Sequence, residues 1–261
     1  MRFGGIERLY GQGSLTRLQA AHVAVIGLGG VGSWAAEALA RSGVGRITLI
    51  DLDDVCVTNV NRQIHALEDT VGLPKARAMA DRLARINPDL EMHVEEAFFN
   101  RTNAEAILSR EFDYVVDAID SIRDKCLLVD QCHQRKQRIV ISGGAGGKRD
   151  PSQVRRADLG QATNDPLLKR LRKKLRQEYG FSRDLKEPFG MSAVYSEENP
   201  VFPWSNGTVC HRPEPDSSLK LDCASGFGTA SFLTGTLGFA AAAIVVEALV
   251  RTGEGCDSAN A

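Results

Sequence analysis

The sequence contains no pair of cysteines with the spacing C-x-x-C. Such a pair usually forms half of a structural zinc site or the centre of a thioredoxin-type redox motif, so neither is indicated. We expect no bound zinc, and we expect most of the cysteines to be small buried apolar side chains. Thioester chemistry at Cys210 or Cys223 is the alternative, and a structural role is favoured for both. The six cysteines are Cys56, Cys126, Cys132, Cys210, Cys223 and Cys256.

The chain also lacks an excess of charge of either sign. Its formal net charge of -1 excludes a uniformly basic nucleic-acid-binding protein but leaves room for a local basic patch. The first ten residues, MRFGGIERLY, contain no apolar run of the kind that forms a secretory signal. We therefore expect a cytoplasmic protein.

Long apolar runs are scarce, and only one segment is both uncharged and long. Phe227–Val246 has no charged residue and is long enough to cross a bilayer. Gly, Ser, Thr and Ala dilute its hydrophobicity, however, and no aromatic or basic anchors flank it. The composition favours a helix buried in the core or at a subunit contact, with membrane association as the weaker alternative.

Strand and helix patterns alternate through residues 1–142. This alternation predicts an α/β fold with a Rossmann-like, mostly parallel sheet and helices on both faces. Helices are expected from Gly30 to Gly43 and from Pro74 to Ile86, where glycine ends the first and proline begins the second. The expected strands are His22–Ile26, Arg46–Asp51, Leu90–Glu95, Asp113–Ala118 and Arg138–Ser142.

Residues 143–225 have a different composition, rich in charge, proline and glycine. We expect this region to be a long crossover insertion over the face of the sheet, with one helix over Asp165–Tyr179 capped by Asn164 or Asp165. An apolar helix over 226–250 then closes the fold, and 251–261 is expected to be a disordered tail. The prediction is a single domain over 1–250, with a nucleotide-binding half at 1–142 and a substrate region at 143–225.

A glycine-rich loop follows the first predicted strand and opens the next helix. In this position glycines let the backbone approach phosphates, and the helix amino terminus supplies partial positive charge. Asp51 ends the second strand, where an acid can bind ribose hydroxyls. The pattern therefore predicts a nucleotide site, which the loop alone does not assign to NAD or ATP. Its glycines are Gly27, Gly29, Gly30 and Gly32.

Polar residues just beyond Asp51 favour a triphosphate over a nicotinamide. A nicotinamide needs an apolar face, whereas β- and γ-phosphates need fixed donors, which Asn59, Arg62 and Lys75 supply. Asp53 and Gln63 belong to the same candidate ATP-binding set. Lys75 and Arg62 are therefore also candidate catalytic residues.

Two carboxylates end the strand that reads YVVDAID. Carboxylates at the carboxyl end of a parallel strand face the ligand crevice, and Mg²⁺ commonly binds one or two carboxylates together with phosphate oxygens. We assign Mg²⁺ and a catalytic role to Asp120. Asp117 is expected to be structural, as a cap of the following helix.

A basic segment between positions 169 and 186 carries eight positive charges against two negative ones. Such a run is often a solvated helix face, but it can also contact RNA phosphates. The candidate RNA-binding residues are Lys169, Arg170, Arg172, Lys173, Lys174 and Arg176.

The series GLGGVGS, LIDLDDV, TNVNRQ, VGLPKA and DAID resembles the ubiquitin-activating enzyme superfamily, which includes the bacterial ThiF, MoeB and HesA-like adenylyltransferases. The resemblance implies that the glycine loop and Asp51 hold ATP, that Asn59, Arg62 and Lys75 contact its phosphates, and that Asp120 binds Mg²⁺. It also implies a homodimer. Two features depart from the adenylyltransferases: the zinc cysteines are missing, and Gly5 stands where they carry a second N-terminal arginine.

A narrower series, RFGGIERLYG, DDVCVTNVNRQIHAL, GGAGG, DPLLKRLR and DCASGFG, is similar to the tRNA threonylcarbamoyladenosine dehydratase branch of that superfamily. The resemblance implies adenylation of the threonyl carboxylate beside the tRNA anticodon, followed by ring closure with net loss of water. It leaves open a sulfur-transfer protein as a further partner.

Three rival interpretations differ in class. The chain could adenylate the C-terminal glycine of a ubiquitin-like sulfur carrier, which the missing zinc cysteines and the basic segment disfavour. It could be an NAD-dependent oxidoreductase, which TNVNRQ and Lys75 disfavour. A non-enzymatic scaffold would be expected to lose Lys75 or Asp120, and both are present.

Overall fold

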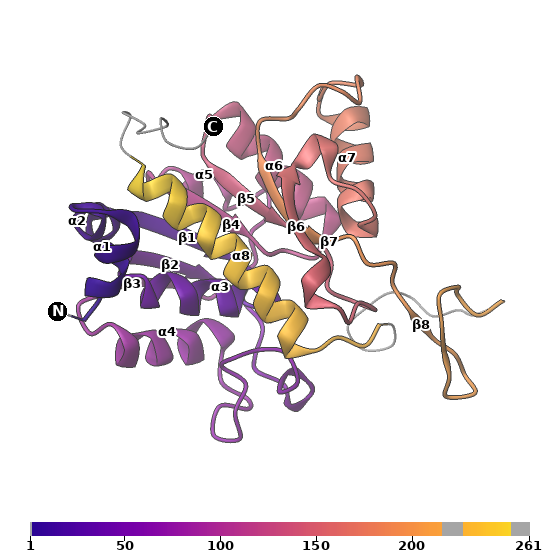
Figure 1. Ribbon diagram of the computed structural model, residues 1–261, viewed down its shortest axis with the longest axis horizontal. Coiled ribbons are helices and arrows are strands. Elements are labelled where there is room, and N and C mark those ends of the chain that lie inside the picture. The colour runs from indigo at the N-terminus through magenta and orange to yellow at the C-terminus, as the bar shows by residue number, and fades with distance from the viewer. Residues whose placement is uncertain (1, 216–226, 252–261) are drawn as a thin grey trace.

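A seven-stranded sheet in the order β3-β2-β1-β4-β5-β7-β6 forms the centre of the protein (Figure 1). The computed structural model describes residues 2–215 and 227–251. Strands β1 to β5 and β7 are parallel, and β6 pairs antiparallel with β7 at one edge. The strands are β1 (His22–Ile26), β2 (Arg46–Ile50), β3 (Glu91–Glu95), β4 (Tyr114–Asp117), β5 (Ile139–Ser142), β6 (Val154–Asp158) and β7 (Ser192–Ser196).

Helices cover both faces of this sheet because the central strands are apolar on both sides. In β1 all five residues are buried, and Val23 and Val25 pack in one core while Ala24 and Ile26 pack in the other. Three helices cover the first face and three the second. They are α3 (Gly30–Arg41), α4 (Lys75–Ile86) and α8 (Ser231–Val250), then α5 (Ala104–Leu108), α6 (Ile122–Gln134) and α7 (Pro166–Glu178).

This architecture confirms the predicted Rossmann-like fold, and the five predicted strands agree with the observed ones to within a residue at each end. Further short elements complete the described chain. They are α1 (Gly4–Tyr10), α2 (Ser14–Ala20), the hairpin strands β8 (Phe202–Pro203) and β9 (Val209–Cys210), and 3-10 turns at Val57–Asn59, Pro151–Gln153 and Leu159–Gln161.

The structure corrects the prediction that the region after Ser142 is an insertion crossing the face of the sheet. It contributes β7 and β6, which extend the sheet beyond β5. The residues SAVYS of β7 are buried after the first position, so this strand completes the core rather than covering it. The predicted helix is present as α7, and Asp165 is its N-cap, accepting a hydrogen bond from the Leu168 amide at 2.9 Å. The β8–β9 hairpin projects from the body (Figure 1).

The apolar helix α8 begins at Ser231 and lies across one face of the sheet (Figure 1). Its length and mean hydropathy of 1.9 would allow a membrane span, but 61% of its most apolar window is buried inside the protein. Leu233, Leu237 and Val245 are fully buried in the core shared with α3. A Cβ on Gly238 would lie 2.7 Å from the Val31 carbonyl oxygen, so glycine permits the close approach of α8 to α3. Cys223 and residues 252–261 of the tail predicted over 251–261 lie outside the described residues.

Candidate functional site

The loops after β1 and β4 meet at the carboxyl edge of the sheet. The strand order reverses between these two neighbours, since β2 and β3 extend to one side and β4 and β5 to the other. Open α/β sheets bind ligands at such a reversal. Gly27 has a φ of +89°, and a Cβ there would lie 2.7 Å from the Ala118 carbonyl oxygen. The glycine loop and the Asp117–Asp120 turn are therefore in direct backbone contact.

The four predicted glycines have different surroundings. A Cβ on Gly32 would lie 1.8 Å from the Gly27 carbonyl oxygen, and one on Gly30 would lie 2.8 Å from the Thr234 methyl group. Gly29, by contrast, faces open space, with nothing within 4 Å of its Cβ position. Helix α3 begins here with no side-chain hydrogen bond at its N-cap. Its first amides are thus available to an anion, which fits the phosphates of a nucleotide.

Asp51 follows β2 and is bound to the glycine loop. One carboxylate oxygen accepts from the Leu28 amide at 2.6 Å, and the other accepts from the Asp53 amide at 2.9 Å. Burial raises the pKa of Asp51, and these two backbone hydrogen bonds oppose that shift. The contacts fix the carboxylate beside the loop, as the ribose-binding assignment requires.

Lys75 and Asp53 form an ion pair at 2.8 Å. The Lys75 side chain is 8% exposed and that of Asp53 is 52% exposed, so a nearly buried lysine meets a carboxylate at the surface. Hydrogen bonds between residues 53–55 and 72–75 hold the two together, including the Lys75 amide to the Asp53 carbonyl at 2.9 Å. Asp53 and Lys75, which were both predicted to bind ATP, are therefore neighbours in the structure.

The predicted phosphate-binding residues lie in a short turn at 56–63. The buried Asn59 accepts from the Cys56 amide at 3.0 Å and so shapes this turn. The Arg62 guanidinium donates to the Thr58 carbonyl at 2.6 Å and to Asn61 at 3.1 Å. Gln63 is buried, and its Oε1 has no hydrogen-bond partner among the described residues.

The two carboxylates after β4 have separate surroundings. Asp117 is fully buried and pairs with the fully buried Lys125 at 2.9 Å, while Lys125 also donates to the Ile119 carbonyl at 3.0 Å. The structure corrects the expected cap, because Ser121 is the N-cap of α6. Asp120 is exposed at the end of the turn. Within residues 2–215 and 227–251, no three His, Cys, Asp or Glu side chains gather as a metal site.

The six basic residues predicted to contact RNA lie on α7 but do not form one uniform surface. Lys169, Arg170 and Lys173 are exposed. Lys174 is paired with Glu178 at 3.3 Å. Arg176 donates to the Ser182 carbonyl at 3.0 Å and lies over the Phe189 ring, and Arg172 is partly buried beside it. The exposed three are the ones free to meet a phosphate backbone.

A buried ion pair that was not predicted from the sequence connects α7 to the carboxyl edge. Lys148 pairs with Asp165 at 2.9 Å, and both side chains are at most 1% exposed. The same carboxylate oxygen accepts from the Gly144 amide at 3.1 Å. A lysine after a glycine run is ordinarily read as exposed, so only the fold reveals that it anchors α7 to the loop after β5.

The described cysteines agree only in part with the expected burial, because Cys56 is exposed. Cys126 and Cys132 are buried, and burial raises their pKa values to about 11 and about 12. Cys210 lies half-buried in β9.

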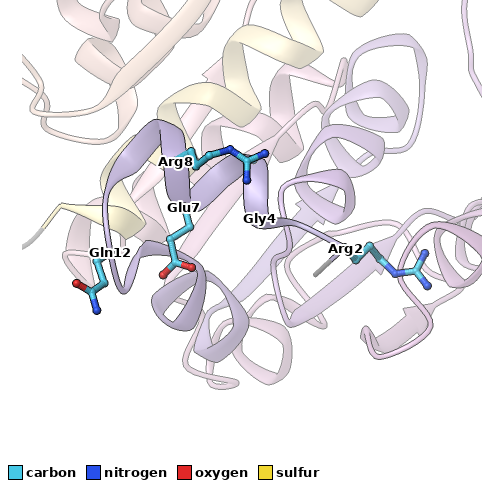
Figure 2. A pocket seen from close by; sticks show the side chains of 6 residues that line it. Arg2, Gly4, Glu7, Arg8 and Gln12 are labelled. Carbon is cyan, nitrogen blue, oxygen red and sulfur yellow. The ribbon is translucent and has the colours of Figure 1, made fainter.

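One cavity among the described residues lies away from the carboxyl edge. It measures about 550 Å³ and is lined by Arg2, Gly4, Gly5, Glu7, Arg8 and Gln12 (Figure 2). Arg2 donates to the carbonyl of Ile86, and Phe3 lies beside Gly43. These contacts precede β3 and β2, at the amino edge of the sheet. This cavity is therefore not the predicted nucleotide site, because the glycine loop, Asp51 and Lys75 lie at the carboxyl edge.

A family comparison agrees with this geometry. The model of the ThiF family matches residues 5–255. The chain belongs to the ThiF family. Known members of similar sequence include the tRNA threonylcarbamoyladenosine dehydratase of Escherichia coli, 49% identical over 92% of this chain and 90% of that protein. The Haemophilus influenzae protein of the same name is 44% identical over 96% of this chain and 94% of that protein.

Solved structures show the same likeness for this ThiF-family chain. The E. coli tRNA N6-threonylcarbamoyladenosine dehydratase in complex with ATP superposes with a TM-score of 0.83 at 43% identity, over 95% of this chain and 93% of that one. The adenylyltransferase and sulfurtransferase MOCS3 of Anopheles gambiae is 40% identical, but over only 51% of this chain and 30% of that protein. The likeness to the dehydratases therefore spans nearly the whole chain, including the region after Ser142, whereas this match spans only about half of the chain.

Proposed function

We propose that this protein uses ATP to convert threonylcarbamoyladenosine beside the tRNA anticodon to its cyclic form. The observation that carries the proposal is the likeness to dehydratases along nearly the whole chain, including the region that supplies β6, β7 and α7. The carboxyl-edge geometry agrees with ATP as the co-substrate. Residues 1–250 would act as one adenylating domain in the cytoplasm.

The glycine loop and Asp51 would hold the nucleotide. The uncapped amino terminus of α3 supplies amides and partial positive charge to the phosphates. Gly29 leaves the space through which they approach. Asp51, already held beside the loop by the Leu28 amide, would accept from ribose hydroxyls.

The first step joins the threonyl carboxylate to the α-phosphorus of ATP and releases pyrophosphate. Lys75 and Arg62 would offset the negative charge of the departing pyrophosphate, which grows as the bond to the α-phosphorus breaks. The side-chain amide of Asn59 would add a hydrogen bond. Lys75 suits that role because its ion pair with Asp53 holds the lysine ammonium group just below the protein surface.

Asp120 fits a bound Mg²⁺ as a single exposed carboxylate at the ligand edge, consistent with an ion that takes its remaining ligands from phosphate and water. Bound there, Mg²⁺ would offset the negative charge of the phosphates. The Asp117–Lys125 pair fixes the turn that carries Asp120, because both the amide and the carbonyl of Ile119 bond to it.

The second step is intramolecular. The ureido nitrogen attacks the activated carbonyl carbon, the ring closes, and AMP and a proton leave. A nucleophile and an electrophile in one side chain have a high effective molarity, so no protein thiol is required. The raised pKa values of Cys126 and Cys132 agree with that conclusion.

The tRNA would contact α7 through Lys169, Arg170 and Lys173. The Lys148–Asp165 pair holds the start of this helix at the carboxyl edge, so RNA bound there would lie near the nucleotide. We further propose a homodimer, for which the exposed Phe232 and Phe239 of α8 offer apolar surface. A sulfur-transfer partner stays a prediction.

Nucleoside mass spectrometry tests the proposal. Threonylcarbamoyl-modified tRNA incubated with the protein and Mg-ATP should lose one water from that nucleoside. Lys75→Ala and Asp120→Ala should abolish this loss, whereas Arg85→Ala, an exposed change on α4, should retain it. An unchanged nucleoside with demonstrable ATP binding would refute the tRNA assignment. Pyrophosphate exchange dependent on a carrier protein would then establish the adenylyltransferase alternative.

A further inference from the structure

The backbone of Arg62 is bound by two side chains from helices that are distant in sequence. Its carbonyl oxygen accepts from Thr234 Oγ1 on α8 at 3.0 Å and from Trp34 Nε1 on α3 at 3.0 Å. The sequence separations are 172 and 28 residues, so the fold alone brings these donors together. Both lone pairs of one carbonyl are thereby occupied.

Thr234 also touches the glycine loop. A Cβ on Gly30 would lie 2.8 Å from the Thr234 methyl carbon, and Thr234 itself is 2% exposed. One buried side chain thus lies between the glycine loop and the 56–63 turn. A second tether runs beside it, since Asn61 Nδ2 donates to the Thr229 carbonyl at 2.8 Å.

The direction of the Thr234 hydroxyl distinguishes it from an ordinary helical threonine. A threonine in a helix commonly bonds back to a carbonyl of its own preceding turn. Thr236 does so, donating to the Phe232 carbonyl at 2.7 Å. The Thr234 hydroxyl is 3.4 Å from the equivalent helix carbonyls and 3.0 Å from that of Arg62. Its shortest bond therefore leaves the helix.

The Arg62 side chain needs such an anchor because its other bonds stay inside its own turn. Its guanidinium contacts Thr58 and Asn61. Those contacts would shift together with the turn and cannot fix the turn against the glycine loop. A small displacement of a charged group from a reacting phosphate weakens its effect strongly.

We infer that Thr234 and Trp34 are positioning residues for Arg62, which hold its backbone at a fixed distance from the glycine loop so that the guanidinium meets the phosphates of ATP. The inference rests on the proposed function of that site. It gives the apolar helix α8 a role in nucleotide binding in addition to its role in the core.

Titration calorimetry with Mg-ATP tests this without tRNA. Thr234→Val removes the hydroxyl and keeps the shape, and it should weaken ATP binding about five- to tenfold, the range expected for one lost buried hydrogen bond. Thr236→Val is the matched control on the same helix and should change the affinity by less than about twofold. Thr234→Ser keeps the hydroxyl and should restore most of the affinity. Equal effects of the two valine variants would overturn the inference.

A double-mutant cycle shows whether the effect acts through Arg62. In an Arg62→Ala background, Thr234→Val should cause no further loss, because the guanidinium that it positions is gone. Full additivity would mean that Thr234 acts by another route and would overturn the inference. If Thr234→Val does not fold, Trp34→Phe removes the second donor and enters the same cycle. A wild-type protein that binds ATP but leaves tRNA unchanged would refute the proposed function and leave this test valid.

Discussion

At the scale of single residues, the glycines of the loop at 27–32 serve two different purposes. Gly32 is required by the protein itself, because a Cβ there would lie 1.8 Å from a backbone oxygen. Gly29 faces open space, so the folded chain does not require a glycine at that position. Its purpose is best explained by the ligand that approaches it.

This difference leads to a paired prediction. Gly29→Ala should keep the unfolding free energy of the wild type within about 1 kcal/mol and should weaken ATP binding about tenfold or more, because its methyl group occupies the phosphate path. Gly32→Ala should destabilise the fold by about 3 kcal/mol or more. Denaturant unfolding and ATP titration measure both. Normal ATP affinity in a folded Gly29→Ala protein would contradict the assignment of the loop.

His65 makes the stability depend on pH. The residue is 1% exposed, neither ring nitrogen has a partner among the described residues, and burial lowers its pKa to about 4. The unfolded chain takes up this proton near pH 6.5 and the folded chain only near pH 4. The unfolding free energy should therefore fall as the pH drops from 6.5 to 4, by up to about 3 kcal/mol.

His65→Gln should reduce that fall, while His133→Gln on the surface of α6 should not. His22, whose pKa burial also lowers to about 4, should add a fall of its own that persists in His65→Gln. Denaturant unfolding at a series of pH values measures the slope, and NMR reports the His65 ring directly. A His65 ring that titrates above pH 6 would rule out this account.

At the scale of elements, α7 combines a structural side with a basic one. Leu168, Leu171 and Leu175 bury one side against the core, and the Lys148–Asp165 pair fixes the first turn. The exposed basic residues are left on the surface for RNA. The helix thereby connects the core to a charged surface beside the carboxyl edge.

Arg170→Ala should lower tRNA affinity and reduce the slope of log affinity against log salt by roughly one, since each phosphate contact contributes about that much. The triple change of Lys169, Arg170 and Lys173 to alanine should reduce it by roughly three. ATP affinity should not change in either protein. Filter binding over a salt series makes the comparison, with Arg85→Ala as control, and equal slopes in all four proteins would exclude α7 as the RNA surface.

At the scale of the whole molecule, α8 determines whether the chain behaves as a globular protein. It lies across the sheet beside α3 (Figure 1) and buries Leu237 completely, while Phe232 is 55% exposed.

Leu237→Ala should cost about 2–5 kcal/mol of unfolding free energy by leaving a cavity. Phe232→Ala should cost about 1 kcal/mol or less. Thermal unfolding measures both, and recovery of the wild type in the membrane fraction would contradict a core position for α8.

Much of the first half was predictable from local pattern. The glycine loop, Asp51 and the strand boundaries follow from spacing and composition, because a buried parallel strand must be apolar and a phosphate loop must be glycine-rich. The helix predicted over Asp165–Tyr179 and observed over Pro166–Glu178 followed in the same way from its cap and its proline. These features depend on neighbours in sequence, which is why the sequence by itself determined them.

Other features depend on residues that are distant in sequence, and only the tertiary structure decided them. The pairing of β7 with β5 and of β6 with β7 places the region after Ser142 in the sheet. The pairs Lys125–Asp117 and Lys148–Asp165 are buried, although each lysine alone resembles a surface residue. The two hydrogen bonds to the Arg62 carbonyl join three separate elements. Burial, ion pairing and anchoring are properties of packed neighbours, and the order of residues along the chain does not specify which neighbours those are.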